Sequence, residues 1–249
     1  MDVPFFKPYL TDQEIDNVNS VLASGWLTTG KWGKEFEQLF SDYIGVKHCV
    51  AVNSATAALH LSVLVSRIQP GDYVLIPTMT FASTAEILYY YNVNPILMDC
   101  NLHDLTISIE DARAKLLTAK KEGKRVTAII PVHYAGKMVN MDLVEDLAEE
   151  YNLDIIEDAA HCCGSGYFSK KYGRWLNKRP KSLTQCYSFY CNKCITTCGE
   201  GGIVATDSEE IAKEVRSLSL HGLSSNAWDR FGKIGNIFYD IACPGFKYN

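Results

Sequence analysis

The chain has 249 residues, of which 47% are hydrophobic and 21% charged, and its formal net charge is −5. This composition is ordinary for a globular protein with a sizeable core, and it excludes a disordered chain or the dense basic surface of a nucleic-acid-binding protein. No stretch is long and apolar enough to span a bilayer, and the first residues lack the basic and apolar segments of a secretion signal, so we expect a cytoplasmic protein.

Nine cysteines are many for this length. Without an export signal we expect free thiols and not disulfides. Cys191 and Cys194 have the C-x2-C spacing of a zinc site, but such a site needs a second pair or spaced histidines. Small buried side chains are therefore the better interpretation, and no metal is predicted. A cysteine-based metal-binding protein is kept as an alternative that metal analysis would decide.

In chain order, helices and strands alternate. Thr11 and Glu14 form a capping box that opens a helix toward Ser24, and apolar residues at helical spacing predict a second helix over 36–44, ended by Gly45. The elements that follow are a strand over 48–52, a helix over 55–65, a strand over 73–76, a helix over 81–91, a strand over 95–98, a helix capped by Ser108 and running to about 121, a strand over 126–130, a helix over 141–151, strands over 154–157 and 203–205, and a helix capped by Ser208 and running to about 218.

This alternation predicts βαβ units and a mostly parallel sheet. The strands are apolar on both faces, as in a sheet covered on both sides, so the expected fold class is a three-layer α/β/α architecture. Ligands of such sheets bind at the carboxyl ends of the strands. Polar residues converge there in four segments, which are 53–56, 77–81, His133 and 158–161.

Three segments suggest chemistry, and each has a plainer interpretation when taken alone. In the segment 53–58 small residues turn from a strand into a helix, which gives either an anion site at the helix N-terminus or a simple N-cap. Asp158 at a strand end is suited to a cationic ring nitrogen, a metal or a ribose; the sequence has neither a G-x-G-x-x-G pattern nor a P-loop.

The third segment places Lys193 between the aromatic stretch 187–190 and the glycine-rich stretch 199–202. A lone lysine is usually a solvated surface charge. A lysine that is partly desolvated has a lowered pKa and becomes a nucleophilic amine. Together the three segments supply a phosphate cradle, a carboxylate for a pyridine nitrogen and an amine for a Schiff base, which is the set that pyridoxal 5′-phosphate (PLP) requires.

With these segments the chain resembles the DegT/DnrJ/EryC1/StrS family of sugar aminotransferases, which have the aspartate-aminotransferase fold (PLP-dependent transferase fold type I, large domain). The resemblance covers essentially the whole chain, and the segments that carry it, besides those above, are 3–5, 25–30, 131–136, 156–161 and 245–249. It implies that residues 1–249 form the PLP-binding large domain with its N-terminal segment, and that the family's small C-terminal domain is missing or truncated.

The resemblance also implies roles for individual residues. Lys193 would form the Schiff base and move protons, Asp158 would bind the pyridine nitrogen, and His161 would lie near the ring hydroxyl. Phe81 would stack on the ring. The positions that match phosphate contacts are Ala55, Thr56, Ser188 and, reaching over from a neighbouring subunit, Asn249. Thr28 and Thr29 lie where the family's substrate-side loop begins.

The implied reaction moves an amino group, with glutamate as donor, onto a nucleotide-linked keto sugar. C4 of a 4-keto-6-deoxy sugar is the first expectation and C3 the second. Some relatives are dehydratases with a histidine at the lysine position, so Lys193 favours transamination. Cys198 departs from the glycine or alanine usual in the family. The implied assembly is a homodimer with shared active sites. The alternative is a catalytically silent PLP-binding protein that acts by regulation or interaction.

Overall fold

The computed structural model describes residues 3–176, 181–223 and 240–249, so Met1 and Asp2 of the N-terminal stretch lie outside the described residues. Its centre is a seven-stranded sheet in the order β1-β9-β8-β5-β4-β2-β3. The strands are β1 (His48–Val52), β2 (Tyr73–Pro77), β3 (Asn94–Met98), β4 (Val126–Ile129), β5 (Asp154–Asp158), β8 (Thr184–Ser188) and β9 (Gly202–Thr206). The strands from β3 to β8 pair in parallel, whereas β9 pairs antiparallel with both β8 and β1.

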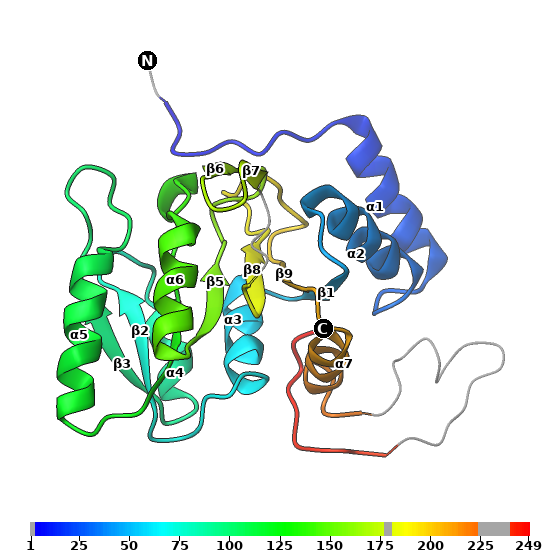
Figure 1. Ribbon diagram of the computed structural model, residues 1–249. Helices are drawn as coiled ribbons and strands as arrows, with labels where there is room; N and C mark the ends of the chain where they lie inside the picture. Colours follow the sequence, from blue (N-terminus) through cyan, green and yellow to red (C-terminus); the bar gives the residue numbers. More distant parts are fainter. Residues whose placement is uncertain (1–2, 177–180, 224–239) are drawn as a thin grey trace.

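Helices cover both faces of this sheet, which gives the three layers visible in Figure 1. On one face α3 (Ala55–Leu64), α4 (Ser83–Tyr89) and α7 (Glu209–Leu218) share a core with the sheet. On the other face α5 (Ile109–Lys121) and α6 (Met141–Tyr151) form one core, and α2 (Lys31–Ile44) forms another. The predicted fold class, a mostly parallel sheet within an α/β/α sandwich, is confirmed.

Helix α3 lies at the centre of its layer because nearly all its side chains are apolar or small. Seven of its ten residues, from Ala57 to Val63, are buried. In contrast, α1 (Asp12–Ser24), which the Thr11–Glu14 capping box opens as expected, has no buried residue. A helix that is apolar all round belongs in a core, whereas α1 is held by its cap and not by burial.

Two features differ from the sequence-based expectation. The sequence indicates only an aromatic segment around Tyr187, but residues 184–188 form the fully buried strand β8 between β5 and β9. A short antiparallel hairpin, β6 (Tyr167–Ser169) and β7 (Arg174–Leu176), was not predicted. Strands of three residues carry too little alternation to be detected in the sequence.

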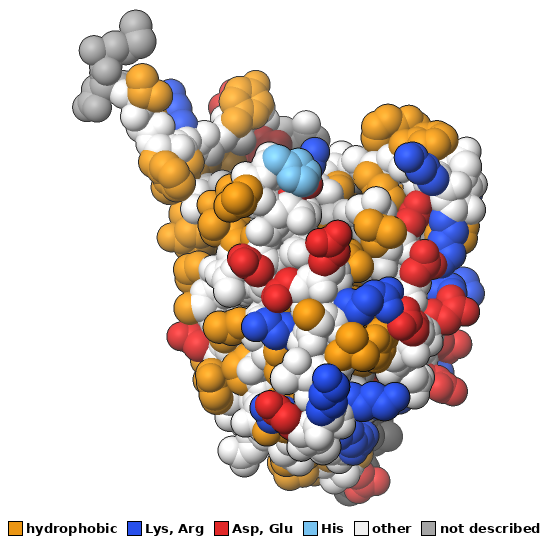
Figure 2. Space-filling view, turned by 60° about the vertical axis from the view of Figure 1, so that its left-hand side comes forward, with side chains coloured by type: hydrophobic (Ala, Val, Ile, Leu, Met, Phe, Trp, Pro, Cys, Tyr) orange, Lys and Arg blue, Asp and Glu red, His pale blue; other side chains and the backbone are white. Residues whose placement is uncertain are grey.

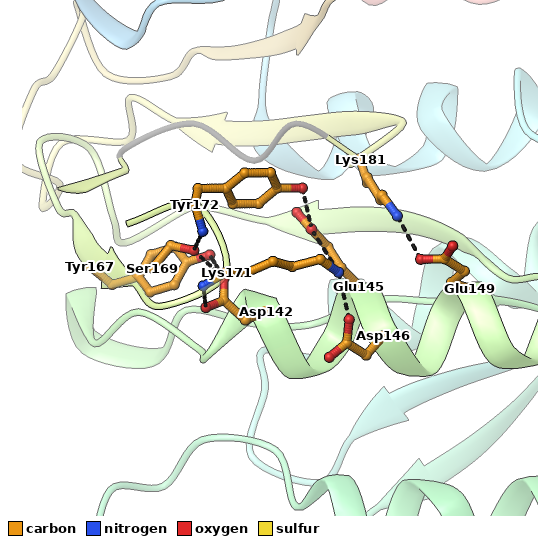
Figure 3. A network of polar contacts seen from close by, with 9 residues as sticks. All are labelled: Asp142, Glu145, Asp146, Glu149, Tyr167, Ser169, Lys171, Tyr172 and Lys181. Atoms are coloured by element: carbon orange, nitrogen blue, oxygen red, sulfur yellow. Dashed lines mark hydrogen bonds and ion pairs between the residues drawn. The ribbon is translucent and has the colours of Figure 1, made fainter. Parts of the chain in front are cut away.

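The hairpin is fastened to α6 by polar contacts (Figure 3). The Asp142 carboxylate accepts hydrogen bonds from the Tyr167 hydroxyl at 2.9 Å, the Ser169 hydroxyl at 2.6 Å and the Lys171 backbone N–H at 3.0 Å. One turn further on, Glu145 is buried and accepts from the Tyr172 hydroxyl at 2.8 Å. Within the part of the chain that the structure describes, no helix has the length and apolar character needed to cross a membrane.

Candidate active site

The carboxyl ends of β1, β2, β5 and β8 meet at one cavity of about 560 Å³. Seven residues predicted from the sequence line it together, namely Ala55, Thr56, Phe81, Asp158, His161, Ser188 and Lys193. The lining also includes residues that the sequence did not single out for the site, among them Thr80, Tyr134, Tyr190, Asn192 and Glu200. The convergence expected from strand topology is therefore present in the structure.

The N-terminus of α3 forms one end of the cavity. Ser54 caps the helix: its hydroxyl accepts from the Ala57 N–H at 3.1 Å, and its carbonyl accepts from the Ala58 N–H at 3.0 Å. The N–H groups of Ala55 and Thr56 have no acceptor among the described residues. Free N–H groups at the positive end of a helix dipole form an anion site.

Ser188 is brought to this anion site by a close backbone contact. Gly202, which begins β9, pairs with Ser188 across the sheet. A Cβ atom at Gly202 would lie 2.3 Å from the carbonyl carbon of Ser54 and 2.4 Å from its oxygen. Only glycine lets β9 start directly against the turn that precedes α3. The backbone of the glycine-rich stretch therefore forms one side of the anion site.

Asp158 is buried and both of its carboxylate oxygens have donors. The Thr84 hydroxyl donates to Oδ2 at 2.8 Å, and the Ala160 N–H donates to Oδ1 at 3.2 Å. Thr80 and Thr84 are in hydrogen-bond contact at 2.7 Å. Because the single proton of Thr84 goes to Asp158, Thr80 must be the donor of that contact. These two donors fix the orientation of the Asp158 side chain.

Thr84 was missed because a threonine in the first turn of a helix reads as an ordinary helix residue. The only sequence signal was the spacing of four between Thr80 and Thr84, directly after a strand end. That spacing places two hydroxyls on the same side of a helical turn.

Lys193 follows a tight turn in which its backbone N–H donates to the Tyr190 carbonyl at 2.9 Å. Partial burial lowers the pKa of its ammonium group, while the negative charge of Asp158 acts in the opposite direction. A lowered pKa raises the fraction of neutral amine near pH 7. A neutral lysine amine in a cavity is a nucleophile and a base.

His161 lies at the open edge of the cavity, where Nδ1 accepts a hydrogen bond from the Ala135 N–H at 3.2 Å. Burial of part of the ring lowers the pKa of His161, and the nearby Lys193 charge lowers it further. Phe81 also stands at the edge, with 74% of its side chain exposed. The cavity therefore has one neutral imidazole and one uncovered aromatic face at its mouth.

Three predicted residues do not line this cavity in their own chain. Thr28 is exposed, and Thr29 lies beside Trp26, whose indole N–H donates to the Thr29 carbonyl at 3.0 Å. Asn249 follows Tyr248, whose carbonyl accepts from the Asn53 N–H at 2.7 Å, and its side chain accepts from Lys247. Asn249 therefore lies close to the anion site but does not line the cavity.

The sequence and the fold are similar to those of known proteins. The chain is 40% identical over 247 residues to an uncharacterized protein of Methanocaldococcus jannaschii, a match that covers 99% of the chain and 61% of that protein. It is 36% identical over 247 residues to the spore coat polysaccharide biosynthesis protein SpsC of Bacillus subtilis, covering 99% and 60% respectively. The chain therefore spans about three fifths of the length of these relatives.

Among solved structures, the Streptococcus pneumoniae protein Spr1654, which is named as a sugar aminotransferase, superposes in its PMP form with a TM-score of 0.85 at 29% identity. The match covers 100% of this chain and 64% of that one. The PLP form of the same protein superposes with a TM-score of 0.82. Residues 8–249 match the family profile, and the chain belongs to the DegT/DnrJ/EryC1/StrS aminotransferase family.

Proposed function

We propose that this chain is the cofactor-binding part of a PLP-dependent aminotransferase that acts on a nucleotide-linked keto sugar. The observation that carries the proposal is the meeting of three groups on one cavity: the free N–H groups at the start of α3, the Asp158 carboxylate and the Lys193 amine. The same three groups are the partners that the phosphate, the pyridine nitrogen and the aldehyde of PLP require.

The residues present fit PLP at both of its ends. At the anionic end, the N–H groups of Ala55 and Thr56 and the Ser188 hydroxyl would hold the phosphate, and Gly202 leaves room for them to converge. At the ring, the Asp158 carboxylate would keep the pyridine nitrogen protonated. When bound, PLP supplies an electron-withdrawing ring that stabilises negative charge at the carbon bearing the amino group.

Three side chains of the protein would then bind the cofactor and transfer the protons. Lys193, whose pKa is lowered by burial, would bind the cofactor covalently through Nζ and, once displaced by substrate, would take up and return a proton at the reacting carbon. Phe81 would cover one face of the ring. His161 would donate to the ring hydroxyl.

The family and its named relatives support the proposed substrate class. We infer glutamate as amino donor and a nucleotide-linked keto sugar as acceptor, with C4 of a 4-keto-6-deoxy sugar as the expected position. The role of SpsC in polysaccharide biosynthesis supports a sugar acceptor. Thr28 and Thr29 would lie on the substrate side, and Asn249 would contact the phosphate in a second copy of the chain.

Borohydride trapping tests the cofactor assignment. Incubation with PLP followed by reduction should fix one label on Lys193, located by peptide mass spectrometry. Lys193→Ala should lose this label, and Lys170→Ala, a change at a lysine outside the site, should keep it. A label that remains in Lys193→Ala, or that sits on another lysine of the unchanged protein, would refute the assignment.

The acceptor is tested separately, by mixing the amine form of the cofactor on the whole protein with candidate acceptors. A 4-keto-6-deoxy sugar nucleotide should restore the aldehyde absorbance, and 2-oxoglutarate should do so in the reverse donor reaction. Recovery with simple oxo acids other than 2-oxoglutarate, and with no keto sugar nucleotide, would contradict a sugar substrate.

A further inference from the structure

A buried histidine closes the loop that follows β4. His133 Nδ1 accepts a hydrogen bond from the Val139 backbone N–H at 3.2 Å, and Nε2 lies 2.7 Å from Oε2 of Glu157. Both side chains have no exposed surface. Since Nδ1 is an acceptor, the single proton of the neutral ring must be on Nε2, which therefore donates to Glu157.

Between its two ends, this loop has an unusual backbone. Ala135 has φ 51° and ψ 29°, in the left-handed region, and Gly136 follows with φ 81°. The left-handed conformation costs a residue with a Cβ atom roughly 1–2 kcal/mol. Such a conformation persists only where the surrounding structure fixes it, and the His133 contacts to Val139 and Glu157 do so at the base of the loop.

The left-handed residues Ala135 and Gly136 lie against His161. A Cβ atom at Gly136 would lie 3.3 Å from the His161 carbonyl oxygen, and the Tyr134 ring meets the His161 ring edge-on with centroids 6.3 Å apart. From this position the Ala135 N–H donates to Nδ1 of His161. Because Nδ1 is occupied as an acceptor, the proton of the neutral imidazole is on Nε2, on the side away from the loop.

We propose that Glu157 and His133 are positioning residues that hold His161 as its Nε2–H tautomer, through the backbone of residues 133–139. His133 is among the residues that line the cavity and Glu157 is not. The pair sets which ring nitrogen of His161 can donate into the cavity. With PLP bound, the Nε2–H group of His161 would donate to the hydroxyl of the PLP ring, and this consequence rests on the proposed function. The tautomer itself is a property of the protein without cofactor.

The test is nitrogen NMR of the histidine-labelled protein without cofactor, with the His161 signals assigned from a His161→Gln variant. We expect His161 to show an unprotonated Nδ1 and a protonated Nε2. In Glu157→Met, which keeps the volume but removes the acceptor, both tautomers should appear, and the Ala135 amide should exchange with solvent about tenfold faster or more. Glu157→Gln keeps an acceptor for His133 and should behave like the unchanged protein.

Glu145→Met is the matched control, because Glu145 is an equally buried glutamate that contacts the β6–β7 hairpin and not this loop. It should leave both readouts unchanged. An Nδ1–H ring at His161 in the unchanged protein would overturn the proposal without any variant. So would an unaltered His161 tautomer and Ala135 exchange in Glu157→Met, or, if that variant does not fold, in His133→Met. Failure of PLP binding would leave these readouts as they are and would count against the proposed function alone.

Discussion

Asp158 and Glu157 are neighbours in β5, but they face opposite sides of the sheet because side chains alternate along a strand. Asp158 points into the cavity, and Glu157 pairs with His133 behind it. The two carboxylates therefore serve the same site in different ways. Asp158 contacts whatever binds there, and Glu157 acts on the cavity only through the loop over residues 133–139.

At the residue scale, Thr84 is the donor that fixes Asp158, and Thr84→Val tests this. Valine has nearly the same shape but cannot donate to Oδ2, so the carboxylate loses one of the two donors that the described residues give it. Loss of a hydrogen bond to a charged group costs about 1.5–3 kcal/mol. We expect PLP to bind at least about tenfold more weakly, measured by absorbance titration.

Thr118→Val is the control for Thr84→Val. Thr118 lies on the surface of α5, and its hydroxyl donates to the Ala114 carbonyl at 3.0 Å. PLP affinity should be unchanged in that variant. Equal affinity in Thr84→Val and the unchanged protein would show that Asp158 is held without Thr84.

At the scale of elements, the contact between β9 and the start of α3 is set by Gly202. Gly202→Ala would drive a Cβ atom into the Ser54 backbone, which cannot move as a flexible side chain would. We expect the free energy of unfolding to fall by about 3 kcal/mol, measured by urea denaturation. Gly33→Ala in α2 is the matched control: a Cβ there meets no atom of the described residues within 4 Å, so stability should rise by about 0.5–1 kcal/mol. A Gly202→Ala protein as stable as the unchanged one would show that the strand can shift.

The junction between α6 and the β6–β7 hairpin should be sensitive to acid (Figure 3). Burial works to raise the pKa of Asp142, but the hydrogen bonds from Ser169, Lys171 and Tyr167 outweigh it and lower that pKa. A carboxylate with a lowered pKa stabilises the folded state above its unfolded pKa of about 3.9, and this contribution is lost as the pH falls through the folded pKa.

Asp142→Asn should therefore lower the free energy of unfolding at pH 7 by about 2 kcal/mol, and its difference from the unchanged protein should shrink below about pH 4. Asp146→Asn is the control: it removes one exposed ion pair with Lys171 and should cost less than about 1 kcal/mol. Denaturant titrations at pH 7 and at pH 3 give both values. A constant difference between Asp142→Asn and the unchanged protein at both pH values would contradict this explanation.

Long elements and strand ends were predictable from the sequence, whereas contacts across the fold were not. Periodicity and caps such as Ser108 and Ser208 predicted most helices to within about two residues, because these signals are local. The cavity lining followed from strand ends, because parallel strands bring their carboxyl ends together. The Thr84–Asp158 and His133–Glu157 contacts join residues 74 and 24 positions apart, and no local pattern encodes such pairs.

At the scale of the whole molecule, the N-terminal segment has apolar side chains that no described part of the chain covers. Phe5 is 93% exposed and Tyr9 87%, and Figure 2 shows hydrophobic side chains along the segment where it extends from the body. Ile15, Val18 and Leu22 on α1 are exposed as well. Contiguous exposed apolar surface marks an interaction site. We propose that a second copy of the chain covers this apolar surface, because Asn249 lies beside the anion site without lining the cavity of its own chain.

A subunit-mixing experiment tests this shared site. In a homodimer with exchanged Asn249 residues, Asn249→Ala chains would keep Lys193 but lack the phosphate contact from their neighbour. At limiting PLP they should therefore take up little borohydride-fixed label.

When such chains are unfolded and refolded together with Lys193→Ala chains, mixed dimers form in which Lys193 of one chain meets Asn249 of the other. Labelling per Asn249→Ala chain should then rise by about fivefold or more, the factor that one restored hydrogen bond to a charged oxygen gives. Mixing with a Lys193→Ala, Asn249→Ala double variant is the matched control and should give no rise. Equal labelling in both mixtures would show that Asn249 does not act across subunits. The shared site would also be excluded if the unchanged protein had the mass of a single 27.8 kDa chain while its site filled with PLP.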